Sequence, residues 1–528
     1  MSTALLSFPT RAAGAVSAAI AVLLAGCVNL APSYQTPALP VPPTLADAPR
    51  PAVGTAAVND PGAVPLGQDA GPMDWRAFVQ ERRLADVIAL SLANNRDLRV
   101  ALLAIERARA QYGIQQAGLL PQVNATAGGS RSRTADDLTT AGRSNTTEQY
   151  SAQLGFASYE IDFFGRVRNL NDAALQEFLR TAESRRSVEL SLIADVANAW
   201  LTLDADARRL RLARETLRTR QQSLDVTRQA HALGGVSGLT LAQTQTTVDS
   251  ARVDVATYAA QVARDRNVLA LLAGAPVPPA LLPDSVAAAE AADAAPAAAA
   301  TGSPGDTLRT TSSAPLAPPP PPATALLAVP ADLPATVLLR RPDVQAAEYA
   351  LRGSYASIGA ARAAFFPSIT LTGSVGTASN ALSGLFDGGN RTWSFAPQIR
   401  LPIFTAGLNQ ANLQVAQVAR DTAIAQYDKS IQTAFREVAD ALADRATLQE
   451  RIAAQASLVD ATQRALDLSV GRFRLGADSY LAVLDAQRTL YTAQQTQISL
   501  QLAEQANRIT LYKALGGGWA GGPAPAPD

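Results

Sequence analysis

Two long stretches of the chain carry apolar residues at every seventh position among polar ones. In the first, these positions are Val196, Leu203, Leu210, Leu217 and Leu224. In the second they are Ile424, Ile431, Val438, Ile452, Val459, Leu466 and Phe473, with Arg445 as the one interruption. Sustained heptads predict helices that pack on partner helices in a left-handed supercoil. At about 1.5 Å of rise per residue, a helix over residues 166–232 would be roughly 100 Å long, too long for an ordinary globular domain.

The two stretches match each other along their whole length. Gly407 minus Gly165 gives an offset of 242 residues, which holds without an insertion to the end of the second stretch. The pairs that it relates include Gly234 with Gly476, Leu239 with Leu481, Gln245 with Gln487, and Gly274 with Gly516. A fixed self-similarity of this length indicates one structural unit built twice. We therefore predict helical hairpins over residues 166–274 and 408–516 that turn at Gly234 and Gly476 with a positive φ.

A shorter helical pattern precedes each hairpin. The first runs over residues 75–119 and the second over residues 344–365, and each stops just before a proline, which cannot continue a helix. With these helices, the first structural repeat covers residues 76–274 and the second covers residues 331–516.

Between each short helix and its hairpin, apolar and polar residues alternate with period two. This pattern predicts four strands, at residues 122–130, 149–162, 368–376 and 393–403. Each is near the length of about 9 to 11 residues with which a barrel strand crosses a bilayer. The polar segments 131–148 and 376–392 would be long loops. A soluble β-sandwich is the alternative, because one apolar face could pack on a core, although no second sheet is available to cover it.

Four strands cannot close a barrel, and lipid tolerates no open sheet edge. The chain must therefore assemble with copies of itself. Two copies would give eight strands, whose interior is filled by side chains, whereas three copies would give twelve strands and leave a lumen. The predicted fold is an α+β membrane protein of two internal repeats. A trimer of it, with four strands from each chain, would have a 12-stranded β-barrel that the long helices continue as a second tube.

Three further segments are predicted from composition alone. Residues 275–330 are rich in alanine and proline and should form an unstructured linker between the repeats, and residues 517–528 a disordered tail. Residues 27–75 are rich in the same residue types and should form an extended tether.

The beginning of the chain resembles an export signal. Arg11 precedes a small-residue apolar run over residues 12–25, which has the length of a secretory signal peptide rather than of a spanning helix. The residues Leu24-Ala25-Gly26-Cys27 resemble the bacterial lipobox, which implies a signal peptide over residues 1–26 and a covalent lipid on Cys27. Val28 stands where an aspartate would resemble an inner-membrane retention signal, so the resemblance favours the outer membrane. An ordinary signal peptide cut near a chance cysteine is the alternative.

Composition and charge exclude several classes of function. The 528 residues carry 45 Lys and Arg against 45 Asp and Glu without a basic run, so no nucleic-acid partner is indicated. Cys27 is the only cysteine, which excludes an intrachain disulfide. His231 is the only histidine, and we predict a structural role because a lone imidazole makes neither a metal site nor a catalytic triad. We expect no enzyme, no metal, and no cofactor besides the lipid on Cys27.

Several motifs together resemble the TolC-like family of outer-membrane efflux proteins, in its lipoprotein branch. They are Ala31-Pro32-Ser33-Tyr34-Gln35-Thr36-Pro37, Leu338-Leu339-Arg340-Arg341-Pro342-Asp343-Val344, Ala364-Phe365-Phe366-Pro367, Leu481-Ala482-Val483-Leu484-Asp485-Ala486-Gln487 and Leu511-Tyr512-Lys513-Ala514-Leu515-Gly516-Gly517-Gly518-Trp519. The resemblance covers the chain from Cys27 to Trp519. The long linker before Ala331 departs from the compact one expected in that family.

The resemblance implies a homotrimeric exit duct in the outer membrane of a Gram-negative bacterium, lipid-anchored and extending into the periplasm as a helical barrel. Such a duct meets a periplasmic adaptor and an inner-membrane pump, and it passively exports small molecules such as drugs. A duct for protein secretion and a non-conducting structural coiled coil across the envelope are the alternatives.

The resemblance also implies roles for single residues. Leu481 and Asp485 match the apolar and acidic positions of the periplasmic gate, and three copies of Asp485 on an axis would form a ring that selects cations. The first repeat offers Leu239 and Gln243 at the same places, so we expect the second hairpin to swing outward on opening while the first stays nearly fixed. Gly234 and Gly476 would dock the adaptor. The residues alone favour the alternative that Asp485 is a solvated surface carboxylate.

Overall fold

The computed structural model describes residues 29–42, 74–140, 142, 144–294, 326 and 335–517. These residues form two compact units. The first, the sheet unit, comprises described residues within 29–38, 103–184 and 343–430. The second, the hairpin unit, comprises described residues within 39–102, 185–342 and 431–517. Cys27, residues 1–26 and most of the linker and tail lie outside the described residues.

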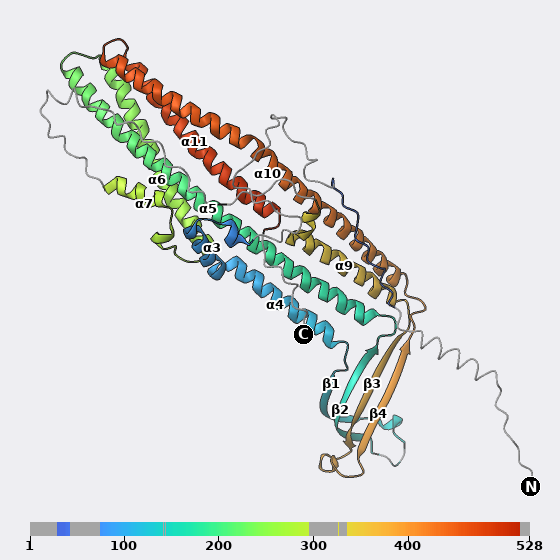
Figure 1. Ribbon diagram of the computed structural model, residues 1–528. Helices are drawn as coiled ribbons and strands as arrows, with labels where there is room; N and C mark the ends of the chain where they lie inside the picture. Colours follow the sequence, from blue (N-terminus) through green and yellow to red (C-terminus); the bar gives the residue numbers. More distant parts are fainter. Residues whose placement is uncertain are drawn as a thin grey trace, which may run out of the picture. The chain divides into compact units, whose positions relative to one another are not determined.

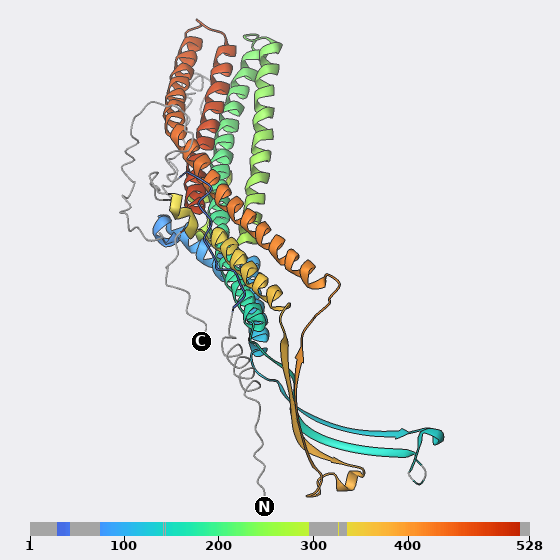
Figure 2. The ribbon, with the colours of Figure 1, turned by 90° about the vertical axis from the view of Figure 1, so that its right-hand side faces the viewer.

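One four-stranded antiparallel sheet dominates the sheet unit. Its strands are β1 (Val123–Arg133), β2 (Thr146–Ile161), β3 (Ser368–Ser379) and β4 (Arg391–Arg400), in the order β1-β2-β3-β4 (Figure 1). A bulge between Phe156 and Tyr159 shifts the register of β2 on β3, and Ser158 takes a φ of 55° there. The β1–β2 hairpin continues past its last pair with β3 and curves away from the β3–β4 hairpin (Figure 2).

The strand boundaries correct the predicted ones. Strand β1 continues through Arg133 and β2 begins at Thr146, so the loop between them is shorter than residues 131–148. Polar residues extend this hairpin because the backbone ladder does not require apolar side chains, and the Arg131 Nε to Glu148 Oε1 ion pair at 3.0 Å spans it. Strand β3 likewise runs past residue 376 to Ser379, and β4 covers Arg391–Arg400 instead of residues 393–403. Pro402, which cannot donate to a ladder, follows the end of β4.

No second sheet occurs in the part of the chain that the structure describes, so the β-sandwich alternative is wrong. Two short 3-10 turns lie between the strands, Asp136–Leu138 and Leu382–Gly384. None of the described helices is long and apolar enough to cross a membrane.

The predicted long helices are confirmed. Helices α5 (Arg166–Ala232) and α10 (Leu408–Arg474) each contain 67 residues, and α6 (Gly238–Ala273) and α11 (Tyr480–Ala514) follow their turns. In the hairpin unit the four helices lie side by side (Figures 1 and 2). Heptad residues form the contacts: Val459 and Leu466 of α10 pack on Val483, Leu490 and Ala493 of α11. Ala205 and Leu212 of α5 pack on Tyr491 and Ile498 of α11, so the two hairpins share a core.

The first short helix is divided into three, which corrects the single helix predicted over residues 75–119. Helix α2 covers Trp75–Phe78, α3 Arg82–Asn94 and α4 Arg96–Ala117. Asn95 makes the second break because its extended backbone ends α3 while its Oδ1 accepts from Leu98 N at 3.0 Å and so caps α4. Its Nδ2 donates to Leu272 O at the end of α6, 2.9 Å away. The second short helix, α9 (Pro342–Ala363), follows a 3-10 helix at Ala335–Arg340 and is continuous.

Part of the linker predicted to be unstructured is folded. It contains a 3-10 turn at Pro279–Leu281 and helix α7 at Asp284–Ala294. Trp200 of α5 donates its indole N–H to Leu281 O at 3.0 Å, Arg83 pairs with Asp284, and Arg266 pairs with Glu290 at 2.5 Å. These contacts order an alanine-rich segment whose composition alone favours disorder. Buried Leu326, from the same linker, accepts a hydrogen bond from Arg508 at 2.8 Å through its backbone carbonyl.

Gly274 ends α6 at a site that only glycine fits. Its φ is +67°, and a Cβ at this position would lie 2.4 Å from Asn94 O. We expect Gly274→Ala to lower the free energy of unfolding by about 2 kcal/mol, because it adds backbone strain and a collision with main-chain atoms. Thermal unfolding of the purified protein measures this. Gly113→Ala in α4 is the control, since no atom lies within 4 Å of its added methyl group and helical alanine is favourable. Equal midpoints for the two variants would contradict the expectation.

Candidate functional site

The two hairpin tips have the same backbone design. Gly234 has a φ of 75° and Gly476 a φ of 73°, which confirms the predicted left-handed turns. In each tip the glycine N–H donates to the carbonyl three residues back, and the next N–H donates to the carbonyl five residues back. This Schellman arrangement satisfies the last carbonyls of the long helix. It leaves Leu233 and Leu475, one residue before each glycine, 87% and 85% exposed.

Different side chains fasten the two tips. At the first, His231 Nδ1 lies 2.9 Å from Val236 O, and Ser237 Oγ accepts from Thr240 N at 3.2 Å to cap α6. At the second, Arg472 Nε donates to Asp478 Oδ2 at 2.6 Å. This hydrogen bond from Arg472 lowers the pKa of Asp478. The contacts of His231 and Ser237 therefore close the first tip, and an exposed ion pair closes the second.

The predicted gate residues lie in the first turns of α11. Leu481 and Asp485 are both exposed, one helical turn apart. Arg488 Nη2 lies 2.9 Å from Asp485 Oδ1, an i,i+3 pair that our sequence reasoning did not include. The spacing of the two residues could have indicated it. Any ring built from Asp485 would therefore carry a guanidinium beside each carboxylate.

The corresponding positions in the first hairpin are uncharged. Leu239 is exposed and Gln243 is half-buried on α6. Thr246 stands 242 residues before Arg488 and so takes the place of the arginine. The two hairpins differ in charge near the tips although their backbones correspond.

The sheet carries apolar side chains that nothing in the sheet unit covers. On β4, Trp393, Phe395 and Ile399 alternate with Ser394, Gln398 and Arg400, and Trp393 is 80% exposed. Val123, Leu154 and Val375 on the other strands are also exposed. An apolar surface of this extent indicates contact with lipid or another protein.

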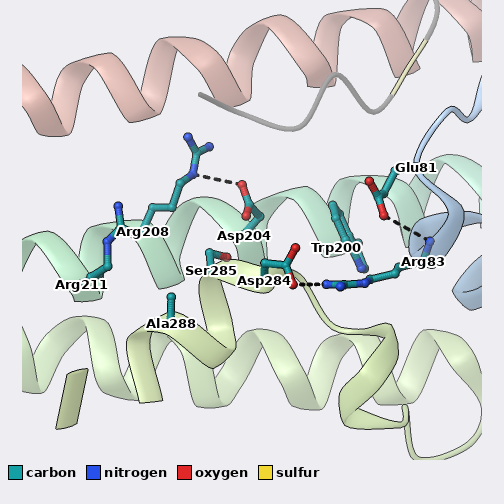
Figure 3. Close-up of a pocket in the computed structure, with 9 residues that line it drawn as sticks. All are labelled: Glu81, Arg83, Trp200, Asp204, Arg208, Arg211, Asp284, Ser285 and Ala288. Atoms are coloured by element: carbon teal, nitrogen blue, oxygen red, sulfur yellow. Dashed lines mark hydrogen bonds and ion pairs between the residues drawn. The ribbon is translucent and has the colours of Figure 1, made fainter. Parts of the chain in front are cut away.

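A polar cavity of about 180 Å³ lies between α5, the start of α3 and α7 in the hairpin unit (Figure 3). Two ion pairs lie in its lining: Arg208 Nε with Asp204 Oδ2 at 3.0 Å, and Arg83 with Asp284. Burial lowers the pKa of Arg208. Among the described residues, no group of three or more His, Cys, Asp or Glu could hold a metal ion. The cavity lies where Asp284, Ser285 and Ala288 of the linker face α5.

The arginine of the Arg340-Arg341-Pro342-Asp343 motif joins three parts of the hairpin unit. Arg341 Nη1 donates to Ala514 O at 2.7 Å, and Arg341 Nη2 pairs with Glu437 Oε2 at 2.8 Å. The side chain is 7% exposed. It therefore caps the last turn of α11 and ties it to α10.

The described residues that follow Cys27 are fastened to the sheet unit. Tyr34 Oη donates to Glu348 Oε1 at 3.0 Å, and the Tyr34 ring meets Tyr355 edge-on at 5.6 Å. Arg362 Nη1 donates to Leu30 O at 3.1 Å. Asn29 lies against Gly165, between β2 and α5. The described residues 29–42 contain no helix or strand, and these contacts hold Asn29, Leu30 and Tyr34 in the sheet unit.

The chain matches known sequences over nearly all its length. The profile of a family described as outer membrane efflux protein matches it twice, at residues 87–275 and 333–517. The toluene efflux pump outer membrane protein TtgC of Pseudomonas putida is 43% identical over 503 residues, covering 95% of each chain. Outer membrane protein OprJ of Pseudomonas aeruginosa is 39% identical over 504 residues, covering 96% of each.

Solved structures share the fold as well. The open state of the MtrE outer membrane channel of Neisseria gonorrhoeae superimposes with a TM-score of 0.75 at 36% identity. The match covers 93% of this chain and 98% of that one. The same arrangement of short helices, strands and long hairpins therefore occurs in a solved outer membrane channel.

Proposed function

Since the chain belongs to the outer membrane efflux protein family, we propose that it is the exit channel of an efflux pump in the outer membrane. It exports small molecules passively, and an inner-membrane pump delivers them through a periplasmic adaptor. The observation that carries this function is the double match of the family profile, one match to each repeat, in a chain with the fold of a solved outer membrane channel.

The assembly is a homotrimer. Strands β1 and β4 are the edges of the sheet, and their outer backbone groups have no ladder partner within it. Because all neighbours are antiparallel in a four-stranded sheet, β4 of one copy can pair antiparallel with β1 of the next. Three copies make a 12-stranded barrel with a lumen. The exposed apolar residues of β4 lie on its outer face, in contact with lipid.

A lipid on Cys27 anchors each chain to the outer membrane. The contacts of Asn29 and Tyr34 support this, because Asn29 lies against Gly165, just after β2, and Tyr34 is hydrogen-bonded to Glu348 of α9. We expect the wild-type mature amino terminus to begin at a diacylated or triacylated Cys27, and Cys27→Ser to lose that mass. Mass spectrometry of the amino-terminal peptide measures this. An unmodified wild-type Cys27, or a mature protein that begins elsewhere, would contradict the lipid anchor.

The gate lies at the second hairpin, at Leu481 and Asp485. Arg472 and Asp478 form an exposed ion pair at that tip. In the first hairpin, the uncharged Leu239 and Gln243 take the places of Leu481 and Asp485. The second hairpin therefore swings outward on opening while the first stays nearly fixed. Gly234 and Gly476, each of which follows an exposed leucine, lie at the tips where the adaptor docks.

Deletion of the gene tests the function. We expect the deleted strain to accumulate toluene or a fluorescent pump substrate, and wild-type protein expressed from a plasmid to restore efflux. Restoration should fail when the inner-membrane pump is inactivated, because the duct supplies no driving force. Unchanged accumulation together with a loss of secreted proteins would favour a protein secretion duct instead, and no change in either would favour a structural scaffold.

A further inference from the structure

Two aspartates meet in the interior of the first hairpin. Asp206 of α5 and Asp265 of α6 are 4% and 8% exposed, and their carboxyl groups lie within hydrogen-bonding distance of each other. Asp265 Oδ2 is buried and has no donor among its neighbours. An ionised carboxylate only accepts hydrogen bonds, so two ionised groups in contact would leave acceptor facing acceptor in a buried site. A proton between them turns the contact into a hydrogen bond.

We propose that Asp206 and Asp265 form a site that binds one proton and makes the packing of α5 on α6 depend on pH. The proton forms an O–H bond on Asp265, and this O–H donates a hydrogen bond to a carboxyl oxygen of Asp206. No bond between heavy atoms changes. The proposal concerns only the packing of α5 on α6. A failure of the proposed channel function would therefore not affect it.

The neighbouring groups place the proton on Asp265. On α5, Arg209 pairs with Asp206, while its Nη2 donates to Ser499 Oγ of α11 at 2.7 Å. On α6, Gln261 Nε2 donates to Asp265 Oδ1 at 3.1 Å, and Arg264 acts on Asp265 only through its charge. Tyr258 and Asp254 of α6 and Gln495 of α11 complete the polar surroundings, with Tyr258 Oη donating to Gln495 Oε1 at 3.0 Å.

These surroundings set the pH range of the site. Burial, followed by the hydrogen bond to Asp206 and its charge, raises the pKa of Asp265 from 3.8 to about 6. Because the folded pKa is above the unfolded one, the stabilisation from the bound proton is complete below about pH 4. It is lost as the pH rises through about 6. The first hairpin is therefore tighter in acid than at neutral pH.

The second hairpin lacks the site, which provides a control within the same molecule. Leu448 stands 242 residues after Asp206, and Asn507 stands 242 residues after Asp265. Both are buried, and Asn507 Nδ2 donates to Ala441 O at 2.8 Å. Neither side chain titrates, so the packing of α10 on α11 carries no comparable dependence on pH.

Hydrogen exchange of the full-length protein compares the two hairpins directly. Protection factors are measured for peptides over residues 258–270 and 500–512 at about pH 4.5 and pH 7.5, after correction for intrinsic exchange rates. The pKa of Asp265 is about 6 in the folded state and 3.8 when the segment is open. The equilibrium constant for opening of residues 258–270 should therefore rise roughly 25-fold from pH 4.5 to pH 7.5. The second segment should change little. Equal changes in both segments, or none in either, would overturn the proposal.

Variants separate a proton site from a structural contact. Asp265→Asn introduces the amide that Asn507 carries at the same place in the second hairpin. It should abolish the difference in protection between pH 4.5 and pH 7.5. Asp467→Asn on α10 should leave it unchanged, because Asp467 accepts a similar hydrogen bond from Gln463 at 3.0 Å but is exposed. A pH difference that persists in Asp265→Asn would refute the assignment. If that variant does not assemble, infrared spectra of wild type should still show a protonated carboxyl band retained to about pH 6. Its absence would refute the assignment too.

A metal ion between the two carboxylates is the remaining possibility, and one further arm of the experiment excludes or establishes it. Protection of residues 258–270 at pH 7.5 should be the same with magnesium, with calcium and with EDTA. Protection that rises with either ion and falls with EDTA would assign the site to a metal and end the proposal for a proton.

Discussion

Replacing Arg341 by leucine is expected to lower the free energy of unfolding of the hairpin unit by about 3 kcal/mol. The change removes a buried charge-assisted hydrogen bond to Ala514 O and the pair with Glu437, and it leaves both partners without that donor. Glu437 is partly exposed to solvent. We therefore expect a loss of stability at the lower end of the range for buried ion pairs. Thermal unfolding followed by helical circular dichroism measures it.

Arg340→Leu is the matched control, since the neighbouring arginine of the same motif is exposed. We expect its midpoint to stay close to that of wild type, as exposed charges contribute little. In Arg341→Leu, hydrogen exchange should also rise first at the end of α11, where the cap is lost. Equal stability of the two variants would show that Arg341 does not hold α11.

The second large effect concerns the charge at the proposed gate. Three copies of Asp485 and Arg488 around an axis would alternate in sign, so removing either charge should unbalance the ring. Asp485→Asn should move the preference of the channel toward anions, and Arg488→Gln should move it toward cations. A unit charge about 4 Å from a permeating ion in watery surroundings changes its energy by about 1 kcal/mol, or roughly fivefold in permeability.

Reversal potentials under a salt gradient across a planar bilayer measure this preference. The double variant Asp485→Asn with Arg488→Gln should return close to the wild-type ratio, because both charges are gone. Gln243→Ala in the first hairpin should have little effect, since that position is uncharged. Reversal potentials that stay at the wild-type value in both single variants would place the pair away from the pore.

The parts of the fold that the sequence predicts best are those fixed by local rules. The turns at Gly234 and Gly476 and the length of α5 follow from a positive φ and from unbroken heptads. The strand ends were less predictable, because the ladder between residues 131–133 and Thr146–Glu148 is made by backbone groups that any residue carries.

Folding of the linker depends on distant partners. Helix α7 is ordered by Trp200, Arg83 and Arg266, none of which is near it in sequence. Composition therefore indicated disorder where tertiary contacts impose a helix. The break at Asn95 has the same origin, since its side chain serves both α4 and the end of α6.

The gate at Leu481 and Asp485 stays a prediction, but the structure changes the charge balance expected there. The resemblance led to Asp485, and the structure adds Arg488 beside it. The contact of Asp206 with Asp265 could not be predicted from the sequence. A heptad pattern shows which apolar residues face a partner helix, but it does not show which polar residues a neighbouring helix buries. Only the packing of α5, α6 and α11 shows that these two carboxyl groups are buried together.

The most direct test of the central claim is the current through a planar bilayer that contains the purified full-length protein. A trimer with a shared lumen predicts discrete conductance steps of a single unit size, appearing one at a time at low protein concentration. Protein that inserts into the bilayer but gives no steps at any voltage would contradict a continuous channel.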